Sequence, residues 1–328
     1  MRETTILLAL GAALLSGCAT STSVQARPLD PYRDGKWIGH GISYGPYRDG
    51  QRPGGARPTR AEMREDLELL RGRWALLRIY SADAVAEDLL SLVREEKLPF
   101  QVLLGAWIAP DAPEENRRQV ETAVRLARAY PDVVLGLCIG NETQVSWSGH
   151  KVPPDVLVGW LREARRGSTL PVSTADDFGF WLEPRSDAVA REVDFIVLHV
   201  YAMWNGQPLD RALAFTQEKH AEVVRRHPGI PVVLGEAGWA TAKHIEGEQA
   251  TLIRGQPGEA QQRIFHEQFT DWVVRDRIVS TWFEAFDENW KGGPHPDEVE
   301  KLWGLFGADR SPKQAVRAAP GPSSLMAP

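Results

Sequence analysis

The chain alternates short apolar runs with amphipathic stretches, and this alternation limits the folds open to it. The apolar runs are residues 38–45, 74–81, 100–108, 133–142, 170–176, 194–201, 230–239 and 280–288. Helix-like periodicity with charges on the opposite face marks residues 60–72, 84–97, 114–130, 154–167, 209–227 and 258–276. Strands that are apolar along their whole length are typical of a parallel sheet covered by helices. The pattern predicts a closed (β/α)8 TIM barrel in one domain. An open doubly wound sheet is the alternative, disfavoured because no glycine-rich dinucleotide fingerprint follows the first run.

The two ends of the chain differ from the repeats. Arg2 precedes the run ILLALGAALL, which is too short to cross a bilayer core of about 30 Å and is typical of a signal peptide. It ends in LSGC, which resembles the lipobox of bacterial lipoproteins, with Cys18 as the lipid-modified residue; the alternative is a plain signal peptide that contains a cysteine. We predict a signal peptide over 1–18, a tether over 19–36, the barrel over 37–317 and a disordered tail over 318–328.

Composition and charge exclude several classes of partner. The 38 basic and 44 acidic residues are interspersed and give a net charge of −6, without the basic stripe of a nucleic-acid binder. We therefore expect a neutral or weakly charged ligand. Separately, the chain is expected to be a monomer. If Cys18 carries a lipid, Cys138 is the one cysteine left and no intramolecular disulfide can form. Cys138 lies in an apolar run and is predicted to be a small buried side chain. No metal or cofactor is expected, because no cluster has metal-ligand spacing.

Two glutamates end apolar runs that the barrel would place on different strands. Glu142 closes the fourth run and Glu236 lies at the end of the seventh. Side chains at the carboxyl ends of barrel strands face the mouth, where such folds place their chemistry. Glycoside hydrolysis needs one carboxyl group that protonates the leaving oxygen and a second, ionised one that faces the anomeric carbon. The pair therefore suggests a glycosidase; two unrelated surface carboxylates are the alternative.

Seven motifs occur in the order expected for a known family. They are GISYGPYRDGQ, LLRIYS, GNET, HVYAMW, GEAGW, FDENWK and EKLWGLFGADRSPK, between about residues 37 and 317. Together they resemble glycoside hydrolase family 17, and its bacterial branch more than the plant endoglucanases. The resemblance implies a retaining enzyme that acts on β-1,3-glucan by double displacement. Glu142 would be the general acid/base and Glu236 the nucleophile.

Further site residues follow from the resemblance and from strand-end positions. Asn141 would bind the 2-hydroxyl of the sugar, and Tyr201 would donate to Glu236. Tyr44, Arg78 and Tyr80 end the first two strands and would bind hydroxyls or orient the acids; Arg78 could equally be a structural ion-pair partner.

Residues near the end of the chain complete the predicted cleft. Glu288, Lys291 and Glu300 match polar residues that line the cleft of the family, and Glu284 would face the mouth by alternation. The indole rings of Trp239 and Trp282 would stack against glucosyl rings of the substrate. His199 is interpreted as a buried histidine inside the barrel, not as a ligand.

Two other activities remain compatible with the sequence. A β-1,3-glucanosyltransferase would use the same two glutamates and let a sugar hydroxyl replace water. A non-catalytic glucan-binding lipoprotein would keep the barrel and lose turnover. In each case the partners expected are a β-glucan and, through a lipid anchor at Cys18, the outer membrane, with the protein facing the periplasm.

Overall fold

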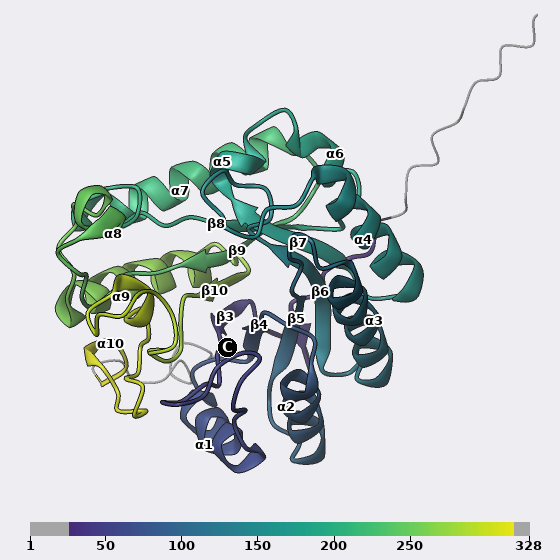
Figure 1. Cartoon of the computed structure of the whole chain (residues 1–328), viewed down its shortest axis with the longest axis horizontal. Helices are drawn as coiled ribbons and strands as arrows, with labels where there is room; N and C mark the ends of the chain where they lie inside the picture. The colour runs from purple at the N-terminus through teal and green to yellow at the C-terminus, as the bar shows by residue number, and fades with distance from the viewer. Residues whose placement is uncertain (1–25, 318–328) are drawn as a thin grey trace, which may run out of the picture.

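The computed structural model describes residues 26–317, which form a closed barrel of eight parallel strands with helices outside it (Figure 1). The barrel strands are β3 (His40–Ser43), β4 (Leu76–Ile79), β5 (Gln101–Ala106), β6 (Val134–Asn141), β7 (Val172–Asp177), β8 (Ile196–His199), β9 (Val232–Ala237) and β10 (Ser280–Trp282). Strand β10 pairs with β3 and closes the barrel. The predicted TIM barrel is confirmed, and the open sheet is wrong.

The helices alternate with the strands as the periodicity predicts. They are α1 (Arg60–Leu70), α2 (Ala84–Glu95), α3 (Pro113–Ala129), α4 (Pro154–Gly167), α5 (Phe178–Trp181), α6 (Ser186–Ala190), α7 (Leu209–Arg226), α8 (Gly247–Leu252), α9 (Glu259–Arg275) and α10 (Gln314–Arg317), with a 3-10 turn η1 at Val299–Lys301. Local sequence fixes several helix starts: Thr59 and Glu62 form a capping box before α1, and Asp83 caps α2. No helix among residues 26–317 is long and apolar enough to cross a membrane.

Residues 27–36 depart from the tether predicted over 19–36. The backbone N–H of Arg27 donates to Asp194 (2.8 Å), its guanidinium donates to two backbone carbonyls, and Leu29 packs on the apolar cluster at the base of the barrel. Strands β1 (Tyr32–Arg33) and β2 (Lys36–Trp37) form a hairpin. The prediction was wrong here because a polar segment can dock through its backbone groups. The signal peptide, Cys18 and the tail over 318–328 lie outside the described residues.

Other local predictions are confirmed. Both PYRDG segments form Asp-Gly turns, and in the first of them Asp34 and Gly35 have positive φ angles of 50° and 73°. Cys138 is a buried free thiol. Strand β10 ends at Trp282, so the second half of the predicted run over 280–288 is loop and leaves the barrel wall at the mouth.

Candidate active site

The backbone at the end of β6 is shaped to present Glu142. The pairing of β6 with β7 shifts register between Cys138 and Asn141, and Gly140 and Glu142 have φ angles of 81° and 50°. A left-handed conformation costs a non-glycine residue on the order of 1–3 kcal/mol, so the surrounding structure must hold it. Here the Glu142 N–H donates to the carbonyl of Ala175 in β7 (2.8 Å). This left-handed conformation turns the chain at the strand end and places the carboxyl group of Glu142 at the mouth.

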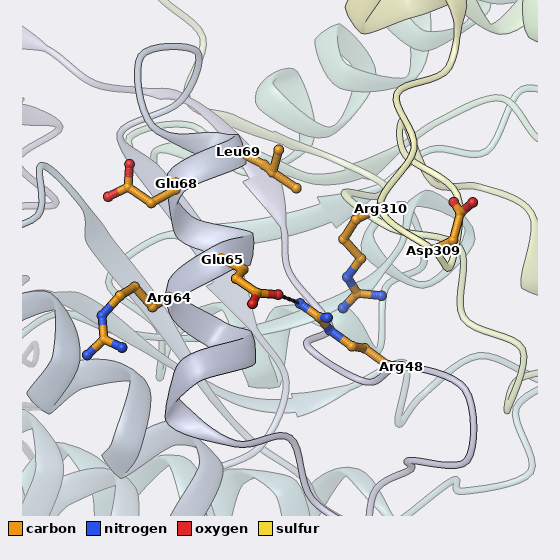
Figure 2. A pocket seen from close by; sticks show the side chains of 7 residues that line it. All are labelled: Arg48, Arg64, Glu65, Glu68, Leu69, Asp309 and Arg310. Atoms are coloured by element: carbon orange, nitrogen blue, oxygen red, sulfur yellow. Dashed lines mark hydrogen bonds and ion pairs between the residues drawn. The ribbon is translucent and has the colours of Figure 1, made fainter.

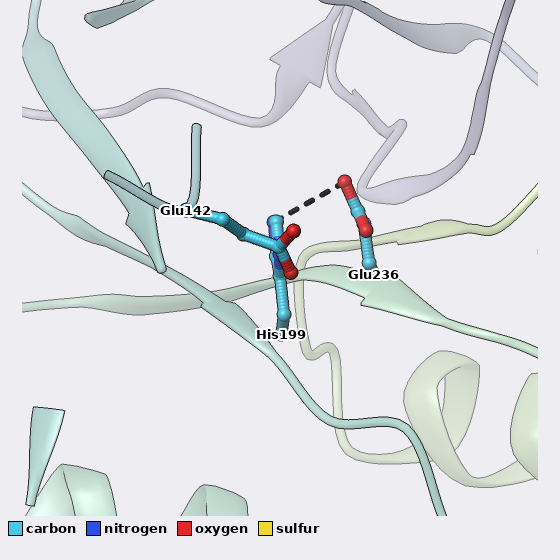
Figure 3. Close-up of side chains that lie close together, drawn as sticks. All are labelled: Glu142, His199 and Glu236. Carbon is cyan, nitrogen blue, oxygen red and sulfur yellow. Dashed lines mark hydrogen bonds and ion pairs between the residues drawn. The ribbon is translucent and has the colours of Figure 1, made fainter. Parts of the chain in front are cut away.

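Glu142, His199 and Glu236 converge on one place at the mouth (Figure 3). One oxygen of each carboxyl group and one ring nitrogen of His199 lie within 4.8 Å of one another. The Glu142 side chain is 15% exposed and the Glu236 side chain 5%. Glu142 directly follows β6, and His199 and Glu236 lie in β8 and β9; these strands are distant in sequence, and the closed barrel alone brings the three residues together.

Glu236 is held by donors on both of its oxygens. Its Oε1 accepts hydrogen bonds from the Arg78 guanidinium (2.6 Å) and from the Tyr80 hydroxyl (3.0 Å), and its Oε2 accepts one from the Tyr201 hydroxyl. Arg78 is 1% exposed, so the ion pair is buried. Such a carboxylate is kept ionised and fixed in one orientation, as an attacking group requires.

Arg78 also orients Asn141. Its second terminal nitrogen donates to Asn141 Oδ1 (2.6 Å). The Asn141 amide NH2 group makes no hydrogen bond within residues 26–317 and can donate to a sugar hydroxyl. Arg78 thus combines the two roles that the sequence left open, since it is a buried ion-pair partner and also positions the groups of the site.

The two glutamates titrate in opposite directions. Burial raises the pKa of Glu142 well above its ordinary value, and the negative charge of Glu236 raises it further. Burial would also raise the pKa of Glu236, but the His199 imidazole, the Arg78 guanidinium and the Tyr201 hydroxyl together lower it. One group therefore keeps its proton while the other stays ionised, which is the division of roles between a general acid and a nucleophile.

His199 touches both carboxyl groups and was missed as a site residue. Its Nδ1 lies 3.0 Å from Glu142 Oε1, and its Nε2 lies 3.3 Å from Glu236 Oε1. Burial lowers the pKa of His199 to about 4, so the ring is neutral near neutral pH. The available signal was period-two alternation, because His199 lies two residues before Tyr201 and so shares its face.

The family model of the BtgE/BtgC glycoside hydrolase domain matches residues 41–304. The chain belongs to this family. A fission yeast (Schizosaccharomyces pombe) glucan 1,3-beta-glucosidase is 26% identical over 262 residues, which are 76% of this chain and 78% of that protein. Glucan endo-1,3-beta-glucosidase btgC of Emericella nidulans is 23% identical over 79% of this chain, which spans 42% of that longer protein. The predicted resemblance to glycoside hydrolase family 17 is confirmed; its bacterial branch stays a prediction.

Solved structures show the same fold. An endo-laminarinase from Formosa superposes with a TM-score of 0.75 at 24% identity and covers 85% of this chain and 86% of its own. A family 17 β-1,3-glucanosyltransferase from Rhizomucor miehei gives 0.67 at 24% identity and covers 84% and 95%. At this identity the likeness is one of fold.

Three predicted sugar contacts of this BtgE/BtgC domain are wrong. Tyr44 is 1% exposed and donates its hydroxyl to Asp66 of α1 (3.2 Å). Trp239 and Trp282 are fully buried; Trp239 donates to the carbonyl of Gln256, and Trp282 packs on the aromatic face of α9. Alternation along a strand places every second side chain behind the barrel wall, where these rings fill the space under the helices.

The polar residues near the end of the chain form one buried cluster at the mouth. Lys291 Nζ lies 2.6 Å from Glu284 Oε2 and 2.7 Å from Glu288 Oε2. Glu284 and Glu288 are almost fully buried, and the Lys291 side chain is 16% exposed. Glu300 accepts a hydrogen bond from Trp204 Nε1 (3.0 Å). Their contact with sugar stays a prediction, with Lys291 the best placed of the ion-paired residues.

One hollow of the surface carries no chemistry of this kind. A hollow of about 420 Å³ beside α1 is lined by Arg48, Arg64, Glu65, Glu68, Leu69, Asp309 and Arg310 (Figure 2). Its arginines pair with acids, as Arg48 does with Glu65 at 2.8 Å.

The spacing of Glu142, His199 and Glu236 could span a metal ion, but both oxygens of Glu236 already accept hydrogen bonds from Arg78 and from two tyrosine hydroxyls. We assign a metal neither to the hollow nor to these three residues.

Replacing Arg78 tests how the pKa of Glu236, the predicted nucleophile, is controlled. In Arg78→Met the pKa of Glu236 rises, because the guanidinium that lowers it is lost. The predicted nucleophile must be ionised to attack, so the acidic limb of the kcat/KM profile should move to higher pH. Removing one partner of a buried pair also costs about 3–5 kcal/mol of stability. Arg125→Met, which breaks the exposed pair with Glu87, is the control. An acidic limb that stays in place would contradict the assignment.

Replacing Asp177 tests how the pKa of Glu142, the predicted general acid, is controlled. The charges that act on Glu142 come from Glu236, Asp177, Glu300 and Arg78. The pKa of Asp177 is itself raised to about 6 by burial, so Asp177 is charged above that pH. Asp177→Asn removes a negative charge that raises the pKa of Glu142. The alkaline limb of the pH profile should therefore move to lower pH, while Asp271→Asn on the exposed side of α9 should leave it unchanged.

Proposed function

We propose that this glycoside hydrolase cleaves β-1,3-glucan by double displacement with retention of configuration. The observation that carries the mechanism is the approach of one oxygen of Glu142 to one oxygen of Glu236 within 4.8 Å. Carboxyl groups about 5–5.5 Å apart suit a covalent intermediate, whereas inverting enzymes leave about 6.5–9.5 Å for a water molecule.

Each residue then has one task in the reaction. Glu236 Oε2, which accepts from Tyr201, or Oε1, which accepts from Arg78 and Tyr80, attacks the anomeric carbon, and Glu142 protonates the leaving oxygen. The deprotonated Glu142 next removes a proton from the incoming water. Asn141 donates to the 2-hydroxyl, a contact that strengthens as the ring flattens. The substrate rests on the names of the relatives, which act on glucan 1,3-β linkages.

The stereochemical course tests this proposal directly. NMR of the first products from a laminari-oligosaccharide should show the β-anomer before mutarotation. An α-anomer at first turnover would contradict double displacement. Cellulose and β-1,4-linked oligosaccharides are the control substrates that test linkage specificity. Cleavage of these at the same rate as laminari-oligosaccharides would contradict the β-1,3 preference.

Glucanosyl transfer is the second candidate for the same site. Trp147 is 62% exposed in the loop that follows Glu142, and Trp107 packs on His150 with ring centroids 4.5 Å apart. The Nε2 of His150 lies 2.7 Å from the carbonyl oxygen of Asn141, so these aromatic rings lie on the side of the acid, where an acceptor sugar arrives. Products longer than a defined laminari-oligosaccharide would identify transfer; shorter products alone identify hydrolysis.

We also propose that Cys18 anchors the chain to the outer membrane, facing the periplasm. The support is the short apolar run that ends in LSGC, followed by Ala19 rather than Asp. Radiolabelled palmitate should be incorporated by the wild type and not by Cys18→Ser. Label in the variant, or none in the wild type, would contradict the anchor.

A further inference from the structure

The base of the barrel, where the strands begin and the helices end, is rich in basic side chains. Five of the long helices carry arginine in the last turn: Arg94 in α2, Arg128 in α3, Arg165 and Arg166 in α4, Arg225 and Arg226 in α7, and Arg275 in α9. Arginine at a helix C-terminus interacts favourably with the helix dipole. In a barrel all these termini lie at one end, so the same local preference produces a basic face.

Some of these charges are neutralised locally and others are not. Arg94 pairs with Asp132, and Arg275 with Asp276. Arg166 and Arg225, together with Arg191 at the C-cap of α6, are exposed and have no acidic partner among residues 26–317. Buried carboxyl groups gather at the opposite end of the molecule, where Arg78 and Lys291 pair with three of them; they are Glu142, Glu236, Glu284, Glu288 and Glu300.

An apolar groove lies next to this basic face. It has a volume of about 360 Å³ and is lined by residues that include Leu29, Val224, Ile230 and Ile278, with Arg277 among them. Val224 is 42% exposed, and the neighbouring Tyr32, 41% exposed, accepts a hydrogen bond from Arg277. Basic side chains around exposed apolar ones match a surface that offers both anionic headgroups and acyl chains.

The chain enters the barrel at this same face. Arg27 is bound to Asp194 and to the end of α4, and Leu29 packs on the base. From Cys18 to Arg27 there are nine residues, which reach at most about 32 Å. We propose that the base of the barrel is a docking face for an anionic phospholipid membrane, so that the mouth opens away from the bilayer. This proposal does not depend on the glycosidase assignment.

The test is binding of the full chain carrying Cys18→Ser, so that no lipid is attached, to sedimenting vesicles. We expect binding to phosphatidylglycerol-containing vesicles at low salt, loss of binding at high salt, and none to pure phosphatidylcholine. Reversal of the three unpaired arginines (Arg166→Glu, Arg191→Glu and Arg225→Glu) should lower the partition coefficient by at least about a hundredfold, because each lost basic side chain removes about fivefold at an anionic surface and each glutamate adds repulsion.

A matched variant has the same change in net charge at the other end. Arg52→Glu, Arg57→Glu and Arg254→Glu lie in loops on the mouth side and are exposed; this triple variant should bind vesicles nearly as well as the parent. Equal loss in the two triple variants would show attraction by net charge alone and overturn the proposal. Binding to heparin or DNA without binding to anionic vesicles would overturn it in favour of another polyanion. Circular dichroism checks that both variants fold.

Discussion

Glu236→Gln should lower kcat on laminari-oligosaccharides by about 10⁴-fold or more, because it removes the attacking oxygen and leaves the site otherwise intact. The amide has nearly the shape of the carboxylate and can still accept from Tyr80 or Tyr201. Substrate affinity should therefore change much less than turnover. Initial rates by reducing-sugar release and binding by calorimetry measure the two effects separately.

The control for Glu236→Gln and the two results that would contradict the prediction can be told apart. Glu121→Gln, on the exposed face of α3, should keep wild-type turnover. Equal rates for the wild type and Glu236→Gln would remove Glu236 from the mechanism. No turnover by either protein, with oligosaccharide binding retained, would instead identify a glucan-binding protein that has lost catalysis.

Glu142→Ala should show an effect that depends on the leaving group. A general acid contributes about 10²- to 10⁴-fold, and this contribution is required only where the leaving oxygen needs a proton. We expect a loss of that size on oligosaccharides and a much smaller loss of the first step on an aryl β-glucoside with an acidic phenol. The comparison of the two substrates measures the proton transfer itself.

Azide provides the complementary measurement. In Glu142→Ala the covalent intermediate lacks a base to activate water, and a small anion can enter the space left by the side chain. Azide should then restore turnover of the activated substrate and give the β-glycosyl azide, while Glu236→Ala should give the α-azide or no reaction. A β-azide from Glu236→Ala, or no rescue of Glu142→Ala at any concentration, would mean that the two roles are wrongly assigned.

Much of the fold was readable because its signals are local. The six long helical stretches correspond to α1, α2, α3, α4, α7 and α9, since each has apolar residues at helical spacing. The docking of residues 27–36 was missed, because it depends on backbone carbonyls and on Asp194, far away in the chain. Such long-range contacts cannot be predicted from the periodicity of the sequence.

The sequence likewise identified some residues of the site and not others. The strand-end position found Glu142 and Glu236, and the motif order added Asn141 and Tyr201. The sequence did not show on which side of the barrel wall Tyr44, Trp239 and Trp282 lie. A shift of one residue along a strand moves a side chain from the mouth to the space behind the wall. His199 was missed for a related reason, because an imidazole in an apolar strand is usually a satisfied core group.

The sequence by itself determined the repeating strand and helix units, the family, and which carboxyl groups stand at strand ends, because these properties belong to short segments. Only the tertiary structure decided that Arg78 holds both Glu236 and Asn141, that His199 lies between two acids, and that arginines scattered along the chain gather at one end. Closure of the barrel is the physical reason. It fixes the distances between groups that the chain separates by dozens of residues, and charge interactions depend on those distances.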